Sequence, residues 1–105
     1  MSVHVFVRFE PRPGKEIEFR AELLRVVELT RTETGCLAIR GFESLREPFV
    51  FAVHSEWVDE GAFDLHAQLP HTVRFLQASH ELLIQPIEGL RTQHIGGGAG
   101  AGAAG

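Results

Sequence analysis

Residues 49–57 read FVFAVHSEW, and this run is the most informative guide to the architecture of the chain. Its side chains alternate with the two-residue period of a β-strand, in which neighbours point to opposite faces of a sheet. One face carries Phe49, Phe51, Val53 and Trp57, and the other carries Val50, Ala52, His54 and Glu56. Apolar side chains thus occur on both faces, whereas a sheet with one face in water has a polar outer side. We therefore expect helices to cover one face and a second copy of the chain to cover the other.

The flanking sequence supplies further elements in a regular order. The predicted strands cover residues 3–9, 36–43, 49–57 and 82–93, and the predicted helices cover residues 15–32, 60–67 and 70–80. Asp59 suits the N-cap of the second helix, Pro70 suits the first turn of the third, and Gly35 follows the end of the first. Pro86 lacks a backbone donor, which indicates an edge position or a bulge in the last strand. The order β-α-β-β-α-α-β predicts an α+β fold, with helices on one face of a ferredoxin-like antiparallel sheet.

Length, charge and composition limit the possible functions. The 105 residues suffice for one domain, which we place at residues 1–94, and the Gly/Ala-rich residues 95–105 are expected to form a flexible tail. The net charge of −4 argues against a nucleic-acid partner, which would need a basic face. No apolar run approaches the ~20 residues that span a bilayer, so a membrane partner is not expected. The single Cys36 cannot form an internal disulfide, which favours a reducing, cytoplasmic location.

Candidate reactive side chains gather in the segment that begins at the end of the FVFAVHSEW strand. Trp57, Phe63, His66, His71 and Phe75 follow one another in the spacing W-x5-F-x2-H-x4-H-x3-F. The strand end and the two short helices after it would let these rings line one cavity. Imidazoles without a metal or cofactor motif indicate chemistry that depends largely on the substrate itself.

Two sequence blocks carry a resemblance to a known family. Residues 30–36 read TRTETGC, a turn between the first helix and the second strand, and residues 56–75 contain a Glu-Trp pair, two His and a Phe. Together these blocks resemble the antibiotic biosynthesis monooxygenase superfamily, and the resemblance extends over residues 2–93. It implies a dimeric α+β barrel, a homodimer joined through the sheet face. It also implies an oxidoreductase that oxidises a quinol or an aromatic polyketide-like phenol with O2, without metal or flavin.

The same superfamily contains haem-degrading enzymes, isomerases of small phosphorylated ketones and members with no assigned chemistry. Ile39 stands where the family often has Tyr, and the chain has no Tyr and no Asn for the pocket of some quinone-forming members. The haem-degrading branch uses an Asn and an axial His, and Leu76 lies near the position of that His. Haem chemistry is therefore disfavoured, although His80 lies one turn later. The alternatives are an isomerase or proton-transfer enzyme for a small polar ketone, and a non-catalytic dimeric binding protein.

Cofactor-free oxygenation needs a base, a donor to the charge that develops on oxygen, and walls that exclude water. His66 is the first candidate base and His71 the second, because an imidazole titrates nearest neutrality. Alternatively, His66 bonds the backbone near the helix break and His71 is a solvated turn residue. Trp57 is the candidate donor through its indole N–H, or simply a core side chain. The candidate substrate-binding residues are Phe51, Phe63, Phe75 and Arg40. Arg40 could instead form a salt bridge on the protein surface.

A metal ion and an organic cofactor are both unexpected. His66 and His71 are five residues apart across a Pro, not the three or four that place two ligands on one helical face. The chain has no Cys cluster and no H-E-x-x-H motif, and its glycine-rich run does not follow a strand-to-helix turn. The expected partners are a small aromatic molecule, O2 and a second copy of the chain.

Overall fold

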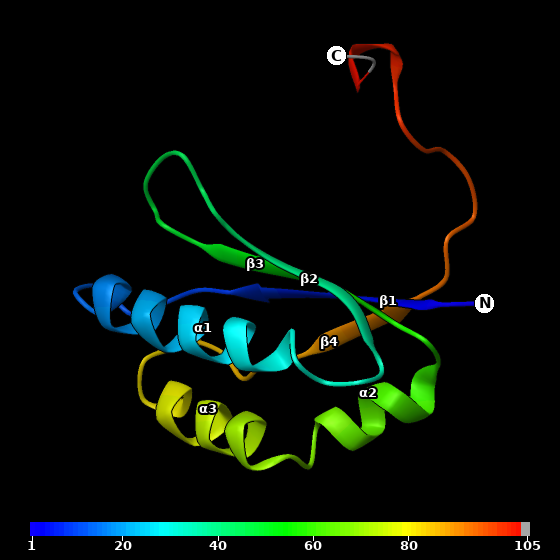
Figure 1. Cartoon of the computed structure of the whole chain (residues 1–105). Coiled ribbons are helices and arrows are strands. Elements are labelled where there is room, and N and C mark those ends of the chain that lie inside the picture. The colour runs from blue at the N-terminus through cyan, green and yellow to red at the C-terminus, as the bar shows by residue number, and fades with distance from the viewer. Residues whose placement is uncertain (104–105) are drawn as a thin grey trace.

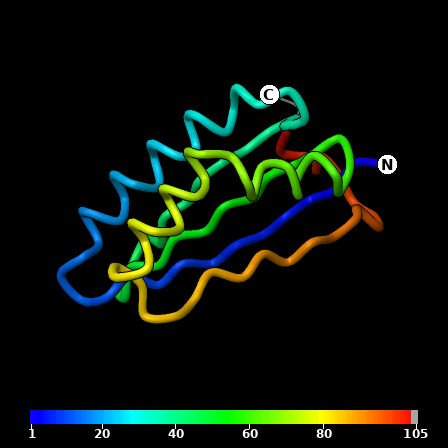
Figure 2. The backbone as a smooth tube through the Cα atoms, turned by 90° about the horizontal axis from the view of Figure 1, so that it is seen from below, coloured from blue at the N-terminus to red at the C-terminus, as the bar shows by residue number. Residues whose placement is uncertain are grey.

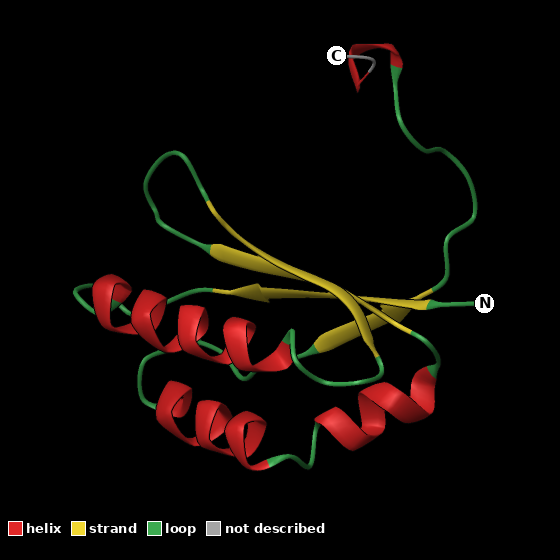
Figure 3. Cartoon of the chain, viewed as in Figure 1, coloured by secondary structure: helices red, strands yellow, loops and turns green. Residues whose placement is uncertain are grey.

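The computed structural model describes residues 1–103, and its elements follow the predicted order (Figure 1). The strands are β1 (Val3–Phe9), β2 (Cys36–Glu43), β3 (Phe51–Trp57) and β4 (Gly89–Thr92), and the helices are α1 (Glu16–Thr30), α2 (Glu60–His66) and α3 (Pro70–His80). A short 3-10 turn covers Ala101–Ala103. The predicted α+β class, with helices on one face of an antiparallel sheet, is confirmed (Figure 3).

Within the described residues the sheet has four strands in the order β2-β3-β1-β4, each antiparallel to its neighbours. Strands β3 and β1 are central, and β2 and β4 form the edges. Figure 2 shows α1 and α3 running side by side along the strands, as a second layer. Because β3 is central and leads into α2, the residues after Trp57 enter the helical layer at the end of this strand (Figure 1).

The core lies between this helical layer and the inner face of the sheet. Phe9 and Phe51 from the strands, Phe19 from α1 and Phe75 from α3 are at most 6% exposed. The ring centroids of Phe19 and Phe51 are 5.3 Å apart, and those of Phe9 and Phe75 are 5.9 Å apart in an edge-on arrangement. Each such side chain contributes about 1.5–3 kcal/mol by leaving water, so these four rings join the two layers.

The prediction of a last strand from residue 82 was wrong, because β4 begins only at Gly89. The backbone N–H groups of Leu82 and Leu83 both donate to the carbonyl of Ser79, and both side chains are 4% exposed in the core. These leucines therefore lie in and just after the turn that follows α3 and close the core there, and Leu83 also makes an isolated antiparallel bridge to Pro11. Pro86 lies in the irregular segment that follows and cannot donate to a ladder. A short apolar run fits a strand and a helix end equally well, and its periodicity does not separate them.

The sheet face opposite the helices, here called the outer face, is uncovered in the single chain. Its apolar members Phe6, Phe42 and Leu90 are 48%, 54% and 65% exposed. His4 and His54 lie beside them, with His4 Nδ1 2.8 Å from His54 Nε2. A group of exposed apolar side chains on one face of a sheet is typical of a surface that binds another protein. Pairing of two copies through the outer face stays a prediction.

His54 should lower the unfolding free energy as the pH is lowered through about 6.5. Partial burial, followed by the charges of His4 and Arg40, lowers the pKa of His54 below its usual 6.5, and Glu56 opposes this shift in part. The unfolded chain therefore takes up a proton at this residue before the folded chain does. The contribution is complete above the unfolded pKa and is lost as the pH falls toward the folded pKa.

Urea unfolding at about pH 7.5 and about pH 5.5, at one fixed chain concentration, measures this effect. His54→Gln cannot titrate, so its stability should change less between the two pH values than that of the wild type. Equal changes in the two proteins would contradict the expected role of His54.

Beyond β4 the chain leaves the body of the fold (Figure 1). The side chain of Ile95 is 95% exposed, and residues 96–103 are exposed as well. The domain boundary after residue 94 and the flexibility of residues 95–105 stay predictions, and the last two residues lie outside the described part. None of the described helices has the length and apolar character that crossing a membrane requires.

Candidate active site

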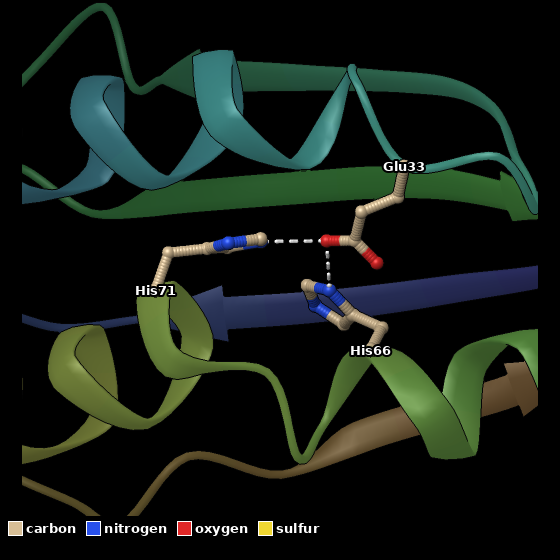
Figure 4. Close-up of side chains that lie close together, drawn as sticks. All are labelled: Glu33, His66 and His71. Atoms are coloured by element: carbon tan, nitrogen blue, oxygen red, sulfur yellow. Dashed lines mark hydrogen bonds and ion pairs between the residues drawn. The ribbon is translucent and has the colours of Figure 1, made fainter.

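The two imidazoles of the helical layer meet at one carboxylate oxygen (Figure 4). His66 Nδ1 and His71 Nε2 each lie 2.7 Å from Oε2 of Glu33. The side chains of Glu33, His66 and His71 are 10%, 13% and 20% exposed. Hydrogen bonds from imidazoles to a carboxylate are charge-assisted, and partial exclusion of water strengthens them. We call these three residues the Glu33 cluster.

Three separate segments position the Glu33 cluster. Glu33 lies in the turn after α1, where its N–H donates to the Thr30 carbonyl at 3.0 Å. His66 is the last residue of α2, and His71 is the second residue of α3. The chain changes direction at residues 67–69, so the two imidazoles face each other across the carboxylate. The five-residue spacing of His66 and His71 argued against two metal ligands on one face of a single helix. That argument does not apply here, because the two residues lie on different helices.

The hydrogen bonds to Glu33 fix the tautomers of both neutral imidazoles. An ionised carboxylate can only accept, so His66 carries its proton on Nδ1 and His71 carries its proton on Nε2. The lone pairs that remain lie on His66 Nε2 and His71 Nδ1. When either ring takes up a proton, the carboxylate stabilises the imidazolium, as the Asp of a serine-protease triad does for its His. The Glu33 cluster is therefore suited to accept a proton from a bound molecule.

Trp57 packs under His66 rather than lining an open cavity. It is 1% exposed, and its ring centroid lies 4.7 Å from that of His66 and 5.6 Å from that of Phe63. The indole N–H donates to Oγ of Ser55 at 2.9 Å. This donor is thus already used within the chain and is not free for a substrate oxygen. The indole can still stabilise a protonated His66, because cations are attracted to the aromatic ring.

The structure separates the four predicted substrate-binding residues. Phe63 lies beside the cluster, with its ring centroid 5.6 Å from that of His66. Phe51 and Phe75 are packed in the core at 3% and 6% exposure. Arg40 pairs with His54 in the sheet ladder, which places it on the outer face, away from the imidazoles. Of the four, Phe63 is brought together with the Glu33 cluster.

The free space next to the cluster is small. A cavity beside His71 and Phe75 has a volume of about 10 Å³, roughly the space that one water needs. Its other lining residues include Glu22, Arg25 and Arg74. A cavity of about 240 Å³ lies farther along α3, beside Leu76 and His80. The sequence led us to expect a cavity lined by these rings, whereas Trp57 is buried and packed directly against His66 and Phe63.

Glu33 is a functional candidate that the sequence pattern did not reveal. It lies inside the TRTETGC block, yet a glutamate in a turn is usually solvated and received no role. It meets His66 and His71 only through the tertiary fold, 33 and 38 positions later. Arg91 of β4 was also missed, and its guanidinium lies 4.8 Å from the centroid of the Phe63 ring.

Replacing Gly35 with Ala should destabilise the fold and displace the turn that carries Glu33. A Cβ at this position would lie 2.5 Å from Cβ of Ala62 in α2, so one of the two segments must move. Overpacking of this kind costs about 1–3 kcal/mol. Thermal unfolding should give a lower Tm for Gly35→Ala than for Gly41→Ala, whose new Cβ meets only Val27 Cγ2 at 3.9 Å. Equal melting temperatures in the two variants would contradict this close packing.

The fold and the cluster together define a ferredoxin-like α+β domain with a carboxylate–imidazole site. The antibiotic biosynthesis monooxygenase family matches residues 2–78, and the chain belongs to this family. The matched range includes Glu33, His66 and His71. The resemblance found in the sequence is thereby confirmed.

The chain is also similar to individual proteins and to a solved structure. Putative monooxygenase YcnE of Bacillus subtilis (strain 168) is 32% identical over 82 residues, which cover 78% of this chain and 86% of that protein. Uncharacterized protein sll1783 of Synechocystis sp. is 32% identical over 77 residues, or 73% of this chain, and the match spans about half of that protein, 52%. The structure of Rv0793 from Mycobacterium tuberculosis superimposes with a TM-score of 0.85 at 26% identity, covering 94% of this chain and 100% of that one.

Proposed function

We propose that this protein is a monooxygenase that oxidises a quinol or an aromatic polyketide-like phenol with O2 and without a bound cofactor. The observation that carries the proposal is the Glu33 cluster, in which one carboxylate orients two imidazoles. Membership of the antibiotic biosynthesis monooxygenase family and the similarity to Putative monooxygenase YcnE support the reaction class.

The reaction begins with removal of a proton from a substrate hydroxyl, because the resulting anion gives an electron to O2 more readily than the neutral phenol. His66 Nε2 is the proposed acceptor, with His71 Nδ1 as the second choice, and Glu33 stabilises the imidazolium that forms. For a hydroquinone, one substrate and one O2 give one hydroxyquinone and one water. One oxygen atom replaces a ring hydrogen as a hydroxyl, and the other leaves as water.

The substrate approaches the partly exposed edges of the imidazoles, since the interior beside Trp57 is filled. His71 is the more exposed of the two, at 20% against 13% for His66. Phe63 supplies an apolar surface next to them. A flat ring that lies against Phe63 would bring its hydroxyl to the imidazole edge, and Phe63 would form one of the walls that exclude water.

O2 uptake with a panel of reduced naphthoquinols tests this function. The wild type should consume O2, and His66→Ala should be slower by about 100-fold or more, the usual contribution of a general base. His80→Ala is the matched control, because His80 is an exposed imidazole of the same helical layer. Equal turnover by His66→Ala and the wild type would remove His66 from the mechanism. No uptake by the wild type across the panel would contradict the oxygenase.

A proton-transfer enzyme or isomerase for a small polar ketone is the second candidate. The charged side chains of Arg25 and Arg74 near His71 favour it, because they could hold a polar ketone at the exposed edge of the imidazole. Such an enzyme would exchange the α-hydrogens of a small hydroxyketone with deuterium from solvent in the absence of O2. Exchange without O2 uptake would select this function over the monooxygenase. The absence of both reactions would favour a non-catalytic binding protein.

We also propose that two copies of the chain pair through the outer face. The exposed Phe6, Phe42 and Leu90 support this arrangement, because the helices cover only the inner face of the sheet. A two-fold dimer would place each of these side chains against the same face of the other copy. The cytoplasmic location remains a proposal that rests on the single Cys36.

A further inference from the structure

We infer that Glu33, His66 and His71 also form a binding site for a divalent transition-metal ion of the Zn²⁺ type. Each residue offers one ligand atom, and these three atoms lie within 4.8 Å of one another. Two imidazole nitrogens and one carboxylate oxygen are a ligand set that zinc and related ions accept. The site lies at the helix break (Figure 4), so three segments distant in sequence hold the ion.

The cluster needs only small side-chain movements to bind a metal. Both nitrogens are now 2.7 Å from the carboxylate oxygen, the distance of a hydrogen bond. Around a tetrahedral zinc ion, with bonds of about 2.0–2.1 Å, neighbouring ligand atoms are about 3.3–3.5 Å apart. Each imidazole nitrogen must therefore withdraw from the Glu33 oxygen by roughly 0.6–0.8 Å, and the two nitrogens, which lie within 4.8 Å of each other, must come to about 3.3–3.5 Å. Rotation about the side-chain bonds would supply both movements.

The surroundings of the three ligands suit a metal with one open position. The three side chains are at most 20% exposed, so water competes weakly for the ion. The negative charge of Glu33 offsets part of the charge of a divalent cation. Three protein ligands leave the fourth position free for water or another small ligand, as in catalytic zinc sites. Oγ of Thr72 lies 3.2 Å from His66 Nδ1 and can hydrogen-bond a water there.

Metal binding and proton uptake by the cluster exclude each other. A bound ion occupies His66 Nδ1 and His71 Nε2. The single proton of each neutral ring must then lie on the other nitrogen, which is Nε2 of His66 and Nδ1 of His71. These are the atoms that carry free lone pairs in the metal-free cluster. An occupied site would therefore lack the base that the proposed function requires, and the metal would act as an inhibitor.

The pair of His4 and His54 on the outer face is the competing site in the described chain. Its two ring nitrogens lie 2.8 Å apart, but the nearest carboxylate, that of Glu56, is 3.8 Å from the other nitrogen of His4. This pair thus offers two ligands rather than three. It provides an internal comparison, because a variant of this pair removes imidazole without changing the Glu33 cluster.

Calorimetric titration of chelator-treated protein with ZnCl2 tests the site directly. The wild type should bind one Zn²⁺ per chain, and Glu33→Gln and His71→Ala should each raise Kd at least about tenfold. His54→Ala should bind as the wild type does. Circular dichroism of each metal-free variant establishes that it is folded. Unchanged Kd in both cluster variants, or a loss of binding confined to His54→Ala, would overturn the inference.

Co²⁺ provides a second readout that needs no substrate. The wild type and His54→Ala should give the visible absorption of a four-coordinate Co²⁺ site, and Glu33→Gln should not. The same spectrum in all three proteins would place the metal elsewhere. These binding measurements do not depend on the proposed oxidation, so either claim can fail without the other.

The inhibitory effect rests on the proposed function and is measured separately. Saturating Zn²⁺ should abolish quinol-dependent O2 uptake by the wild type, and a chelator should restore it. Full turnover at saturating Zn²⁺ would contradict the mutual exclusion of metal and proton.

Discussion

Glu33→Gln should lower kcat/KM for quinol-dependent O2 uptake by about 100-fold or more, with its largest effect on kcat. A glutamine side chain has nearly the same shape but carries no charge. It cannot stabilise an imidazolium, and its NH2 group can turn one imidazole into the wrong tautomer. In a serine-protease triad the equivalent carboxylate-to-amide change is known to act through the tautomer of the His. We expect the same physical cause here.

The control for this variant is Glu22→Gln. Glu22 belongs to α1 and bonds Arg74 at 2.7 Å, on the same side of the fold but outside the Glu33 cluster. Its side chain is more exposed than that of Glu33, at 21% against 10%. Steady-state kinetics should show near-wild-type kcat/KM for Glu22→Gln. Similar losses in both variants would indicate a general effect of acidic residues, and wild-type kinetics for Glu33→Gln would contradict the cluster as the reaction centre.

Phe6→Asp should convert a dimer into a monomer. Phe6 lies on a central strand, 48% exposed, and its ring stacks on His54 with centroids 4.7 Å apart. In a two-fold dimer the new carboxylate of each copy would be buried against an apolar surface, without a partner. An uncompensated buried charge costs about 3–5 kcal/mol and the dimer would bury two of them, so the dissociation constant should rise by roughly 10⁴–10⁷-fold.

Analytical ultracentrifugation over a range of chain concentrations measures this shift. Leu45→Asp is the control, because Leu45 is 97% exposed in the connection between β2 and β3. Wild type and Leu45→Asp should sediment as dimers, and Phe6→Asp as a folded monomer. A monomeric wild type, or a Phe6→Asp variant that remains a dimer at all concentrations, would refute pairing through the outer face.

Sequence periodicity predicted the elements well where both ends carry a specific signal. Pro70 marks the start of α3, and the predicted and observed bounds of that helix are the same, Pro70–His80. Asp59 is the N-cap of α2, and its side chain accepts a hydrogen bond from the Ala62 N–H at 2.8 Å. The last strand lacked such a signal. Its apolar run at residues 82–84 instead lies in and just after the turn that follows α3, and Leu83 makes an isolated antiparallel bridge to Pro11.

The site could be predicted only in part, because its members meet through long-range packing. The sequence indicated Trp57 as a candidate donor to the substrate, but it did not reveal that Ser55 accepts the indole N–H. The position of Glu33 depends on how the end of α1 lies over the break between α2 and α3. No local sequence pattern predicts how close Glu33 comes to His66 and His71. Residue spacing also made a shared metal site of His66 and His71 unexpected, because the spacing rule applies to two ligands on one helix.

A double-mutant cycle on the reaction rate tests the role of the Glu33 cluster most directly. It requires kcat/KM for quinol-dependent O2 uptake by the wild type, Glu33→Gln, His66→Ala and the double variant. If the carboxylate acts through the imidazole, the double variant loses no more than the more severe single variant, because the two groups work as one unit. Losses that multiply in the double variant, or a double variant as active as the wild type, would contradict the cluster as the reaction centre.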